Sequence, residues 1–168
     1  SRMMAERLTK DLRESEERHR TLVDSSPEAV TVHRRGIIIY VNPAAIRFAG
    51  ATSAADLLGQ PLLERVHPDF RPLVAARIKE MTEKHTSVPT VEMKFLKLDG
   101  TPFDVEVQAT EISYDGEPAI RVVARDITDY KIATASIRAS EENYRLLFDG
   151  MLDGFALHEL ICDAAGRP

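Results

Sequence analysis

The sequence predicts an α+β domain with a helix at each end. Three observations predict it. Two short apolar runs, residues 30–32 and 37–41, are separated by a turn. Between residues 91 and 127, apolar and polar residues alternate, as they do in strands that bury one face. At both ends of the chain, apolar and small residues recur at spacings of three and four, which is typical of amphipathic helices.

A ten-residue stretch occurs twice in the chain. Residues 15–24 (SEERHRTLVD) recur as residues 140–149 (SEENYRLLFD), an offset of 140 − 15 = 125 residues. The match continues more weakly, with His33 opposite His158, so we expect a strand after the helix in both copies. We therefore expect residues 150–168 to be the truncated start of a second domain, since so short a segment cannot close a core.

Both copies of the repeat lie in predicted linker helices, which cover residues 1–23 and 129–149. The seam of the first helix includes Leu8, Leu12 and Leu22 at heptad-like spacing. Two arrangements fit this pattern equally well. The helices form a weak coiled coil in a homodimer, or each helix packs back against its own domain.

The first two strands lead into a helix with a recognisable start. Residues 30–32 and 37–41 form a predicted hairpin around Arg34-Arg35-Gly36. Asn42 can cap the following helix, because its side-chain oxygen accepts a hydrogen bond from a free backbone N–H. Pro43 then occupies a position where no N–H is needed.

The middle of the domain is predicted to be helical and the end to be a meander of strands. A short helix is expected at 52–58. A longer one opens at His67-Pro68-Asp69, with an apolar stripe along it. Turns at Asp99-Gly100 and Asp115-Gly116 separate three strands between residues 91 and 127. The stripe consists of Phe70, Leu73, Val74, Ile78 and Met81.

Composition argues against several classes of partner. The net charge is −5, and 22 Lys and Arg are interleaved with 27 Asp and Glu, which disfavours nucleic acid. The longest apolar run, residues 37–41, is too short to span a membrane, and the first residues do not resemble a secretory signal. Cys162 is the only cysteine, so internal disulfides are excluded. We expect a soluble, cytoplasmic chain without direct membrane contact.

Several short motifs, in a fixed order, make residues 24–128 resemble the PAS family. The resemblance implies a five-stranded antiparallel sheet with helices over one face. It also implies a sensory module of a larger signalling protein, and the repeat resembles the tandem PAS domains of sensor histidine kinases in two-component systems. The motifs are residues 25–29, 40–45, 59–61, 67–69, 97–101 and 125–128.

The resemblance implies a ligand site between the sheet and the helices. Flavin-linked relatives need a cysteine in the helical middle and haem-binding ones a histidine on the longer helix, and neither is present, so no cofactor is expected. The five histidines do not give metal-ligand spacing, so no metal site is expected. The alternatives are a filled core or a pocket for a small organic ligand, with Arg77 matching a carboxylate. The hypothetical lining residues are Phe48, Leu58, Phe70, Val74, Arg77, Ile78, Met93, Phe95 and Val105.

The leading hypothesis for function is signal relay. A change in the core would shift the last strand, and Asp126 and Thr128 would pass that shift to the following helix by capping it. The alternatives are a ligand-free dimerisation or spacer module and a small-molecule enzyme. No catalytic residue is expected, because Asp104 and Glu106 alternate with apolar residues and face outward. The parent chain would carry an output domain, such as a histidine kinase or a cyclic-dinucleotide enzyme.

Overall fold

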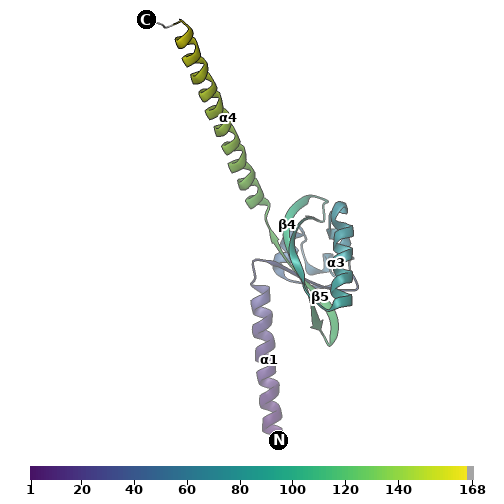
Figure 1. The fold of residues 1–168 in the computed structure, drawn as a ribbon. Helices are drawn as coiled ribbons and strands as arrows, with labels where there is room; N and C mark the ends of the chain where they lie inside the picture. The colour runs from purple at the N-terminus through teal and green to yellow at the C-terminus, as the bar shows by residue number, and fades with distance from the viewer. Residues whose placement is uncertain (166–168) are drawn as a thin grey trace. The chain divides into compact units, whose positions relative to one another are not determined.

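A five-stranded antiparallel sheet forms the centre of the domain (Figure 1). The computed structural model describes the backbone of residues 1–165 and the side chains of residues 1–154. The strands are ordered β2-β1-β5-β4-β3, so the first and last thirds of the domain meet at the β1–β5 pair. Their bounds are β1 Ala29–Arg34, β2 Ile37–Val41, β3 Val88–Leu96, β4 Pro102–Tyr114 and β5 Glu117–Asp126.

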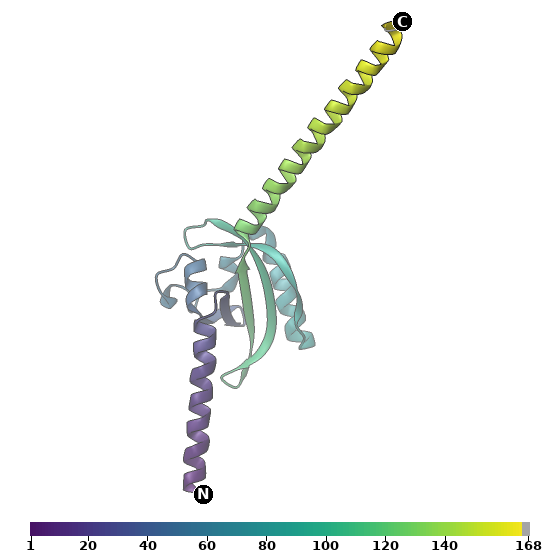
Figure 2. The ribbon, with the colours of Figure 1, turned by 90° about the vertical axis from the view of Figure 1, so that its left-hand side faces the viewer.

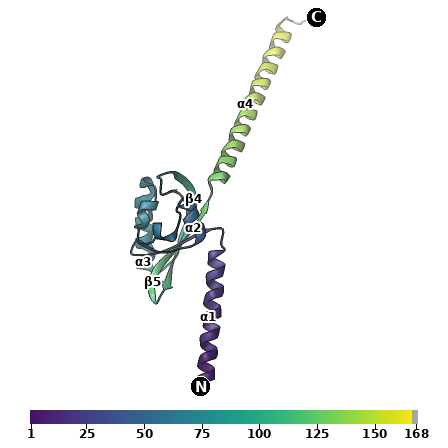
Figure 3. The same cartoon turned by 180° about the vertical axis from the view of Figure 1, so that it is seen from behind.

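The helices between β2 and β3 cover one face of this sheet. The longest of them, α3, lies over β3 and β4, and Figure 2 shows it behind the long strands. The short helix α2, labelled in Figure 3, packs against β1. The predicted fold class is therefore confirmed. The bounds are α2 Pro43–Phe48, η1 Ala54–Asp56, η2 Leu62–Arg65, η3 Pro68–Phe70 and α3 Arg71–Lys84.

The hairpin turns follow from residues that tolerate positive φ. Arg35 and Gly36 have φ angles of 52° and 80°, and Asp115 and Gly116 have 51° and 76°. Two consecutive positive φ angles define the turn whose twist matches that of the flanking strands. These turns set the β1–β2 and β4–β5 registers.

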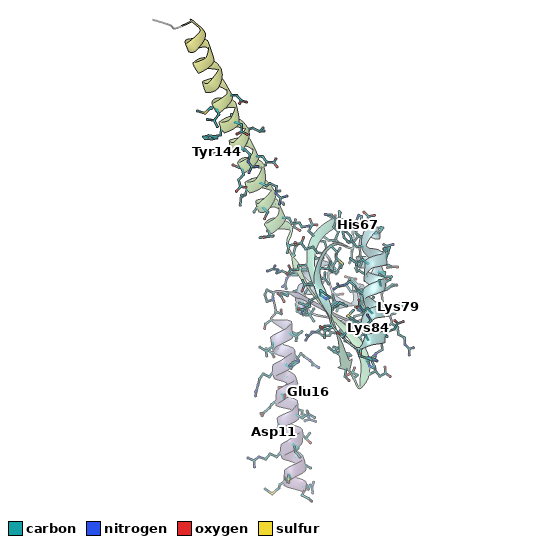
Figure 4. The ribbon with its side chains drawn as sticks, in the orientation of Figure 1. Asp11, Glu16, His67, Lys79, Lys84 and Tyr144 are labelled. Atoms are coloured by element: carbon teal, nitrogen blue, oxygen red, sulfur yellow. The ribbon has the colours of Figure 1, made fainter. Side chains whose placement is uncertain are left out.

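The apolar stripe predicted on the longer helix is only partly buried. Val74 and Met81 are buried, but Leu73 is 40% exposed. The helix also begins as a separate 3-10 turn, η3, in which His67 Nδ1 accepts a hydrogen bond from Asp69 N. Lys79 and Lys84 occupy the exposed face of α3, where each makes an i,i+4 ion pair (Figure 4).

The chain divides into two compact units, residues 1–128 and residues 129–168. In the first unit, α1 (Arg2–Asp24) has no buried residue. The second unit consists, as far as it is described, of α4 (Thr128–Ala165), which begins at the last residue of the first unit. Tyr144, labelled on α4 in Figure 4, is 76% exposed.

The structure differs from the sequence prediction after residue 149. A linker helix ending there and a strand around residues 155–158 were expected, but α4 continues without a break to Ala165. A helix satisfies its backbone hydrogen bonds within one segment, whereas a strand needs a neighbouring strand. That residues 150–168 begin a second domain stays a prediction. The side chains of His158 and Cys162 lie outside the described residues.

Candidate functional site

Two small cavities lie between the sheet and the helices, and we name them cavity A and cavity B. Cavity A has a volume of about 50 Å³ and is bounded by all five strands, α2 and η2. Cavity B has a volume of about 30 Å³ and lies under α3. The two cavities share three wall residues, Leu62, Phe95 and Val122, and so are neighbours in the core.

Three phenylalanine rings contribute to the wall of cavity A. Phe103 packs edge to face on Phe48 and on Phe95, with ring centroids 6.4 Å and 6.3 Å apart. The ammonium of Lys97 lies 5.8 Å from the centroid of the Phe103 ring. Such edge-to-face pairs favour a defined geometry over a fluid interior. The cavity wall is mainly apolar, with Arg65 as its one charged residue.

Six of the nine predicted pocket residues line these cavities. Phe48 and Phe95 line cavity A, and Phe95 also lines cavity B, together with the members from α3 and β3. The guanidinium of Arg77 donates a hydrogen bond to Pro89 O at 2.7 Å. The remaining members that line cavity B are Val74, Arg77, Ile78 and Met93.

The other three predicted residues lie elsewhere. Leu58 is 40% exposed, because the short 3-10 helix η1 ends before it and leaves it at the surface. Phe70 is half-buried and packs on the core without lining either cavity. Val105 is completely buried but lines neither cavity.

Sequence reasoning missed Arg65 and His33, both of which line a cavity. Ala29, Thr31 and His33 occupy the helix-covered face of β1, where they pair with Ala124, Val122 and Ile120 of β5. The predicted strand was based on Val30 and Val32, which occupy the opposite face of β1. Because β1 is buried on both faces, either set could have been read as the core side.

His33 is enclosed in the core without a hydrogen bond. It is 1% exposed, and neither ring nitrogen has a hydrogen-bond partner among the described residues. Burial penalises the charged imidazolium and lowers the pKa of His33 to about 4. The imidazole is therefore neutral at physiological pH.

Arg65 ends helix η2 at the edge of cavity A. Its Nη1 atom is buried and has no hydrogen-bond partner among the described residues. Neither cavity is lined by an acidic side chain. The positive charge of Arg65 therefore meets no counter-charge from the cavity walls.

Asn42 ties the end of α1 to the sheet and to α2. Its side-chain oxygen accepts hydrogen bonds from Val30 N and Ala45 N, both at 2.9 Å. Its amide nitrogen donates to Val23 O and Glu28 O at 3.1 Å and 2.9 Å. The predicted helix cap is therefore confirmed, and the same side chain also holds the last turn of α1.

The junction between β5 and α4 is held by three consecutive residues. Asp126 Oδ1 accepts a hydrogen bond from Thr128 N at 2.9 Å, and Ile127 N donates to Asp104 O at 3.0 Å. The Ile127 side chain is 3% exposed. The Thr128 hydroxyl is buried and has no hydrogen-bond partner among the described residues. The side chain that accepts a hydrogen bond from the N-terminus of α4 is therefore that of Asp126.

The two outward-facing acids of β4 form cross-strand ion pairs. Asp104 contacts Lys94 at 2.9 Å, and Glu106 contacts Arg125 at 3.1 Å. The expected outward orientation is therefore confirmed. In the described part of the chain, no cluster of His, Cys, Asp or Glu is placed to hold a metal ion.

The geometry agrees with the comparison to known families. A family model described as the PAS fold matches residues 17–127. The chain belongs to the PAS family. PAS domains are sensory modules of signalling proteins.

This PAS domain is similar to part of a kinase and to two solved PAS domains. Sporulation kinase A of Bacillus subtilis is 30% identical over 136 residues, which are 81% of this chain and 22% of the kinase. The PAS domain of an HTR-like protein from Haloarcula marismortui has a TM-score of 0.61 at 23% identity, covering 73% of this chain and 99% of that one. The PAS domain of nitrogen regulation protein NR(II) from Vibrio parahaemolyticus has a TM-score of 0.54 at 23% identity, covering 64% and 96%.

A transmembrane span is absent from the described structure. Within residues 1–165, none of the helices combines the length and the apolar character needed to cross a bilayer.

Proposed function

We propose that this PAS domain is the input module of a larger signalling protein and that it passes a change in its core through β5 and Asp126 into α4. One observation carries the proposal: β5 is both a wall of the cavities and the strand that leads into α4. Val122 and Ala124 line cavity A, and the same strand ends at Asp126. A change in the cavities therefore has a short covalent path to the helix.

The junction geometry supports this relay. Asp126 accepts from the first N–H of α4, where the helix dipole favours a negative charge. Ile127 is buried, and its N–H donates a hydrogen bond to Asp104 O of β4, so the residue that precedes α4 is held by the sheet. A shift of β5 therefore changes the position or the capping of the first turn of α4.

The parent protein is proposed to be a cytoplasmic sensor histidine kinase of a two-component system. The similarity to sporulation kinase A supports this, although the chain spans only 22% of that kinase. The output domain, in this proposal, follows α4 in the parent chain. A cyclic-dinucleotide enzyme is the alternative output.

The test replaces Asp126 by Ala in the full-length parent protein. We expect signal-dependent output to fall while the melting temperature changes by only a few degrees, because one exposed cap contributes about 1 kcal/mol. Asp129→Ala is the matched control, since it removes the next carboxylate along the same helix. Unchanged output in Asp126→Ala, or an equal loss in Asp129→Ala, would contradict the relay.

A ligand-free dimerisation or spacer module is the second candidate. The cavities, at about 50 and 30 Å³, are far smaller than the roughly 300 Å³ of an ordinary ligand pocket. The apolar seam of α1 is exposed and available to a second copy, with Leu8, Leu12 and Leu22 between 61% and 65% exposed. This function needs no ligand, and its test is the oligomeric state.

A further inference from the structure

Among the described residues, two side-chain hydrogen bonds join the last turn of α1 to the rest of the domain. The hydroxyl of Tyr40, on β2, donates to Asp24 Oδ1 at 2.9 Å. The amide nitrogen of Asn42, at the start of α2, donates to Val23 O at 3.1 Å. No residue of α1 is buried, so apolar burial contributes little to this attachment. The position of α1 on the domain therefore depends mainly on these two hydrogen bonds.

The surroundings of Tyr40 keep its hydroxyl group in the form that donates. Burial of the phenol and its hydrogen bond to Asp24 raise the pKa of Tyr40 to about 12. The phenol is therefore protonated throughout the physiological range of pH. A hydrogen bond to an ionised acceptor is stronger than one between neutral groups. The contact between Tyr40 and Asp24 is thus the stronger of the two attachments of α1.

A short series of contacts leads from this attachment to α4. The side-chain oxygen of Asn42 accepts a hydrogen bond from Val30 N, on β1, at 2.9 Å. Val30 pairs with Val123 of β5, and β5 ends at Asp126, which caps α4. None of these four residues lines cavity A or cavity B. The two helices are therefore connected by a route that does not pass through the cavities.

We propose that the last turn of α1 is a second input to the relay, and that Tyr40 and Asn42 form a latch that holds it. With the latch closed, a change in α1 reaches β5 through β1, without a ligand in the core. With the latch open, α1 moves without effect on β5. Coupling between two sites requires two such states with different contacts. The inference rests on the proposed function only for the last step, from Asp126 into α4.

The first test measures amide hydrogen exchange by NMR in the purified, ¹⁵N-labelled chain. Tyr40→Phe removes the hydroxyl group of the latch and keeps the ring. The amides of Ser25 and Ser26 donate to carbonyls in the last turn of α1, and we name them the latch amides. The amides of Ile127 and Thr128 are bonded at the β5–α4 junction, and we name them the junction amides. All four are far from residue 40 in the sequence, so the substitution does not alter their intrinsic exchange rates.

We expect Tyr40→Phe to speed exchange of the latch amides at least about threefold, the effect of losing one hydrogen bond of ordinary strength. Exchange of the junction amides should also become faster, because β1 and β5 lose a constraint that α1 supplies. Tyr114→Phe, at the ring that lies 6.4 Å from that of Tyr40, is the matched control and should change neither pair. Junction amides that exchange as in the wild type would overturn the proposal, whatever the latch amides do.

The second test removes the acceptor of the same hydrogen bond. Asp24 is exposed, so Asp24→Ala should leave the domain folded and its melting temperature within a few degrees of the wild type. At the junction amides it should act as Tyr40→Phe does, and the double variant should add nothing further. Asp11→Ala, at an exposed acid of the same helix (Figure 4), is the control. Additive effects of the two latch substitutions would show that they do not act through one contact, and the latch would be rejected.

The third test measures output in the full-length parent protein. Asp24→Ala should change the basal output and Asp11→Ala should not, because only the first opens the latch. In the Asp126→Ala background, Asp24→Ala should have no further effect. Basal output unchanged by Asp24→Ala would contradict α1 as an input and leave the relay from the core standing. If Asp126→Ala itself leaves output unchanged, the relay fails, and the junction amides alone decide whether the latch is coupled to α4.

Discussion

At the scale of single residues, Asn42 and His33 lie close together in the sequence but contribute differently to stability. Asn42 is completely buried and satisfied by four backbone groups from three segments. His33 is equally enclosed, but its ring nitrogens are unpaired among the described residues. The first side chain stabilises the native state, and the second makes that state sensitive to acid.

Asn42→Ala should lower the free energy of unfolding by about 3 kcal/mol, since it removes a helix cap and leaves two buried N–H groups without acceptors. Urea denaturation followed by circular dichroism measures this. Asn143→Ala, at an exposed position of α4, is the control and should have an effect below about 0.5 kcal/mol. Similar losses in the two variants would contradict the role assigned to Asn42.

The stability of the domain should fall as the pH is lowered from about 6.5 to about 4. The unfolded chain binds a proton at His33 in this window and the folded chain does not, because burial lowers the pKa from 6.5 to about 4. The contribution of His33 is fully present above pH 6.5 and amounts to about 3 kcal/mol. His33→Phe should flatten the pH dependence of the urea midpoint in this window. The same slope in wild type and variant would show that His33 does not titrate as argued.

At the scale of secondary-structure elements, glycine is favoured over alanine in the β1–β2 turn but disfavoured within the helix α4. Gly36 has a φ of +80° in the β1–β2 turn, a conformation that other residues adopt at a cost. Gly150 lies within α4, where a Cβ would meet nothing within 4 Å. Replacing each by alanine therefore tests local backbone conformation rather than packing.

Gly36→Ala should lower the free energy of unfolding by about 1 kcal/mol, because alanine is strained at this φ. Gly150→Ala should raise the helicity of the chain, because alanine favours a helix interior over glycine by about 1 kcal/mol. Far-ultraviolet circular dichroism and urea denaturation distinguish the two effects. If Gly150→Ala leaves the helicity unchanged, Gly150 does not reduce the helix content of this part of α4, and the prediction is wrong.

At the scale of the whole molecule, the exposed seam of α1 is where association of two chains would occur. No residue of α1 is buried within the chain, although Leu8 and Leu12 recur at coiled-coil spacing. Packing of this face against its own domain, one of the two arrangements the sequence left open, is therefore not observed. Pairing with a second copy stays a prediction.

The double variant Leu8→Glu/Leu12→Glu should shift a dimer to monomer in sedimentation velocity, because charges would face each other across the seam. Its melting temperature at low protein concentration should equal that of the wild type, because α1 has no buried residue. Lys10→Gln/Arg13→Gln changes the net charge by the same amount off the seam and should leave association unchanged. A wild-type chain that sediments as a monomer at high concentration would contradict this mode of dimerisation.

Much of the fold could be predicted from local patterns, because strand alternation, turn residues and helix caps act over a few positions. The period of two after residue 91 indicated the meander of β3, β4 and β5. Asn42 indicated a helix start, and Asp126-Ile127-Thr128 the end of the sheet. The hypothetical ligand pocket stays a prediction; of its nine residues, Leu58, Phe70 and Val105 have the right chemistry but do not line the cavities.

The sequence by itself determined the element order, the family resemblance and the junction between β5 and α4, since each rests on residues close together in the chain. Only the tertiary structure decided that β1 lies between β2 and β5, and hence that Ala29, Thr31 and His33 face the helices. It alone placed Arg65 beside an apolar cavity without an acidic partner in the cavity wall. Burial depends on what packs against a residue from distant segments, and no local pattern contains that information.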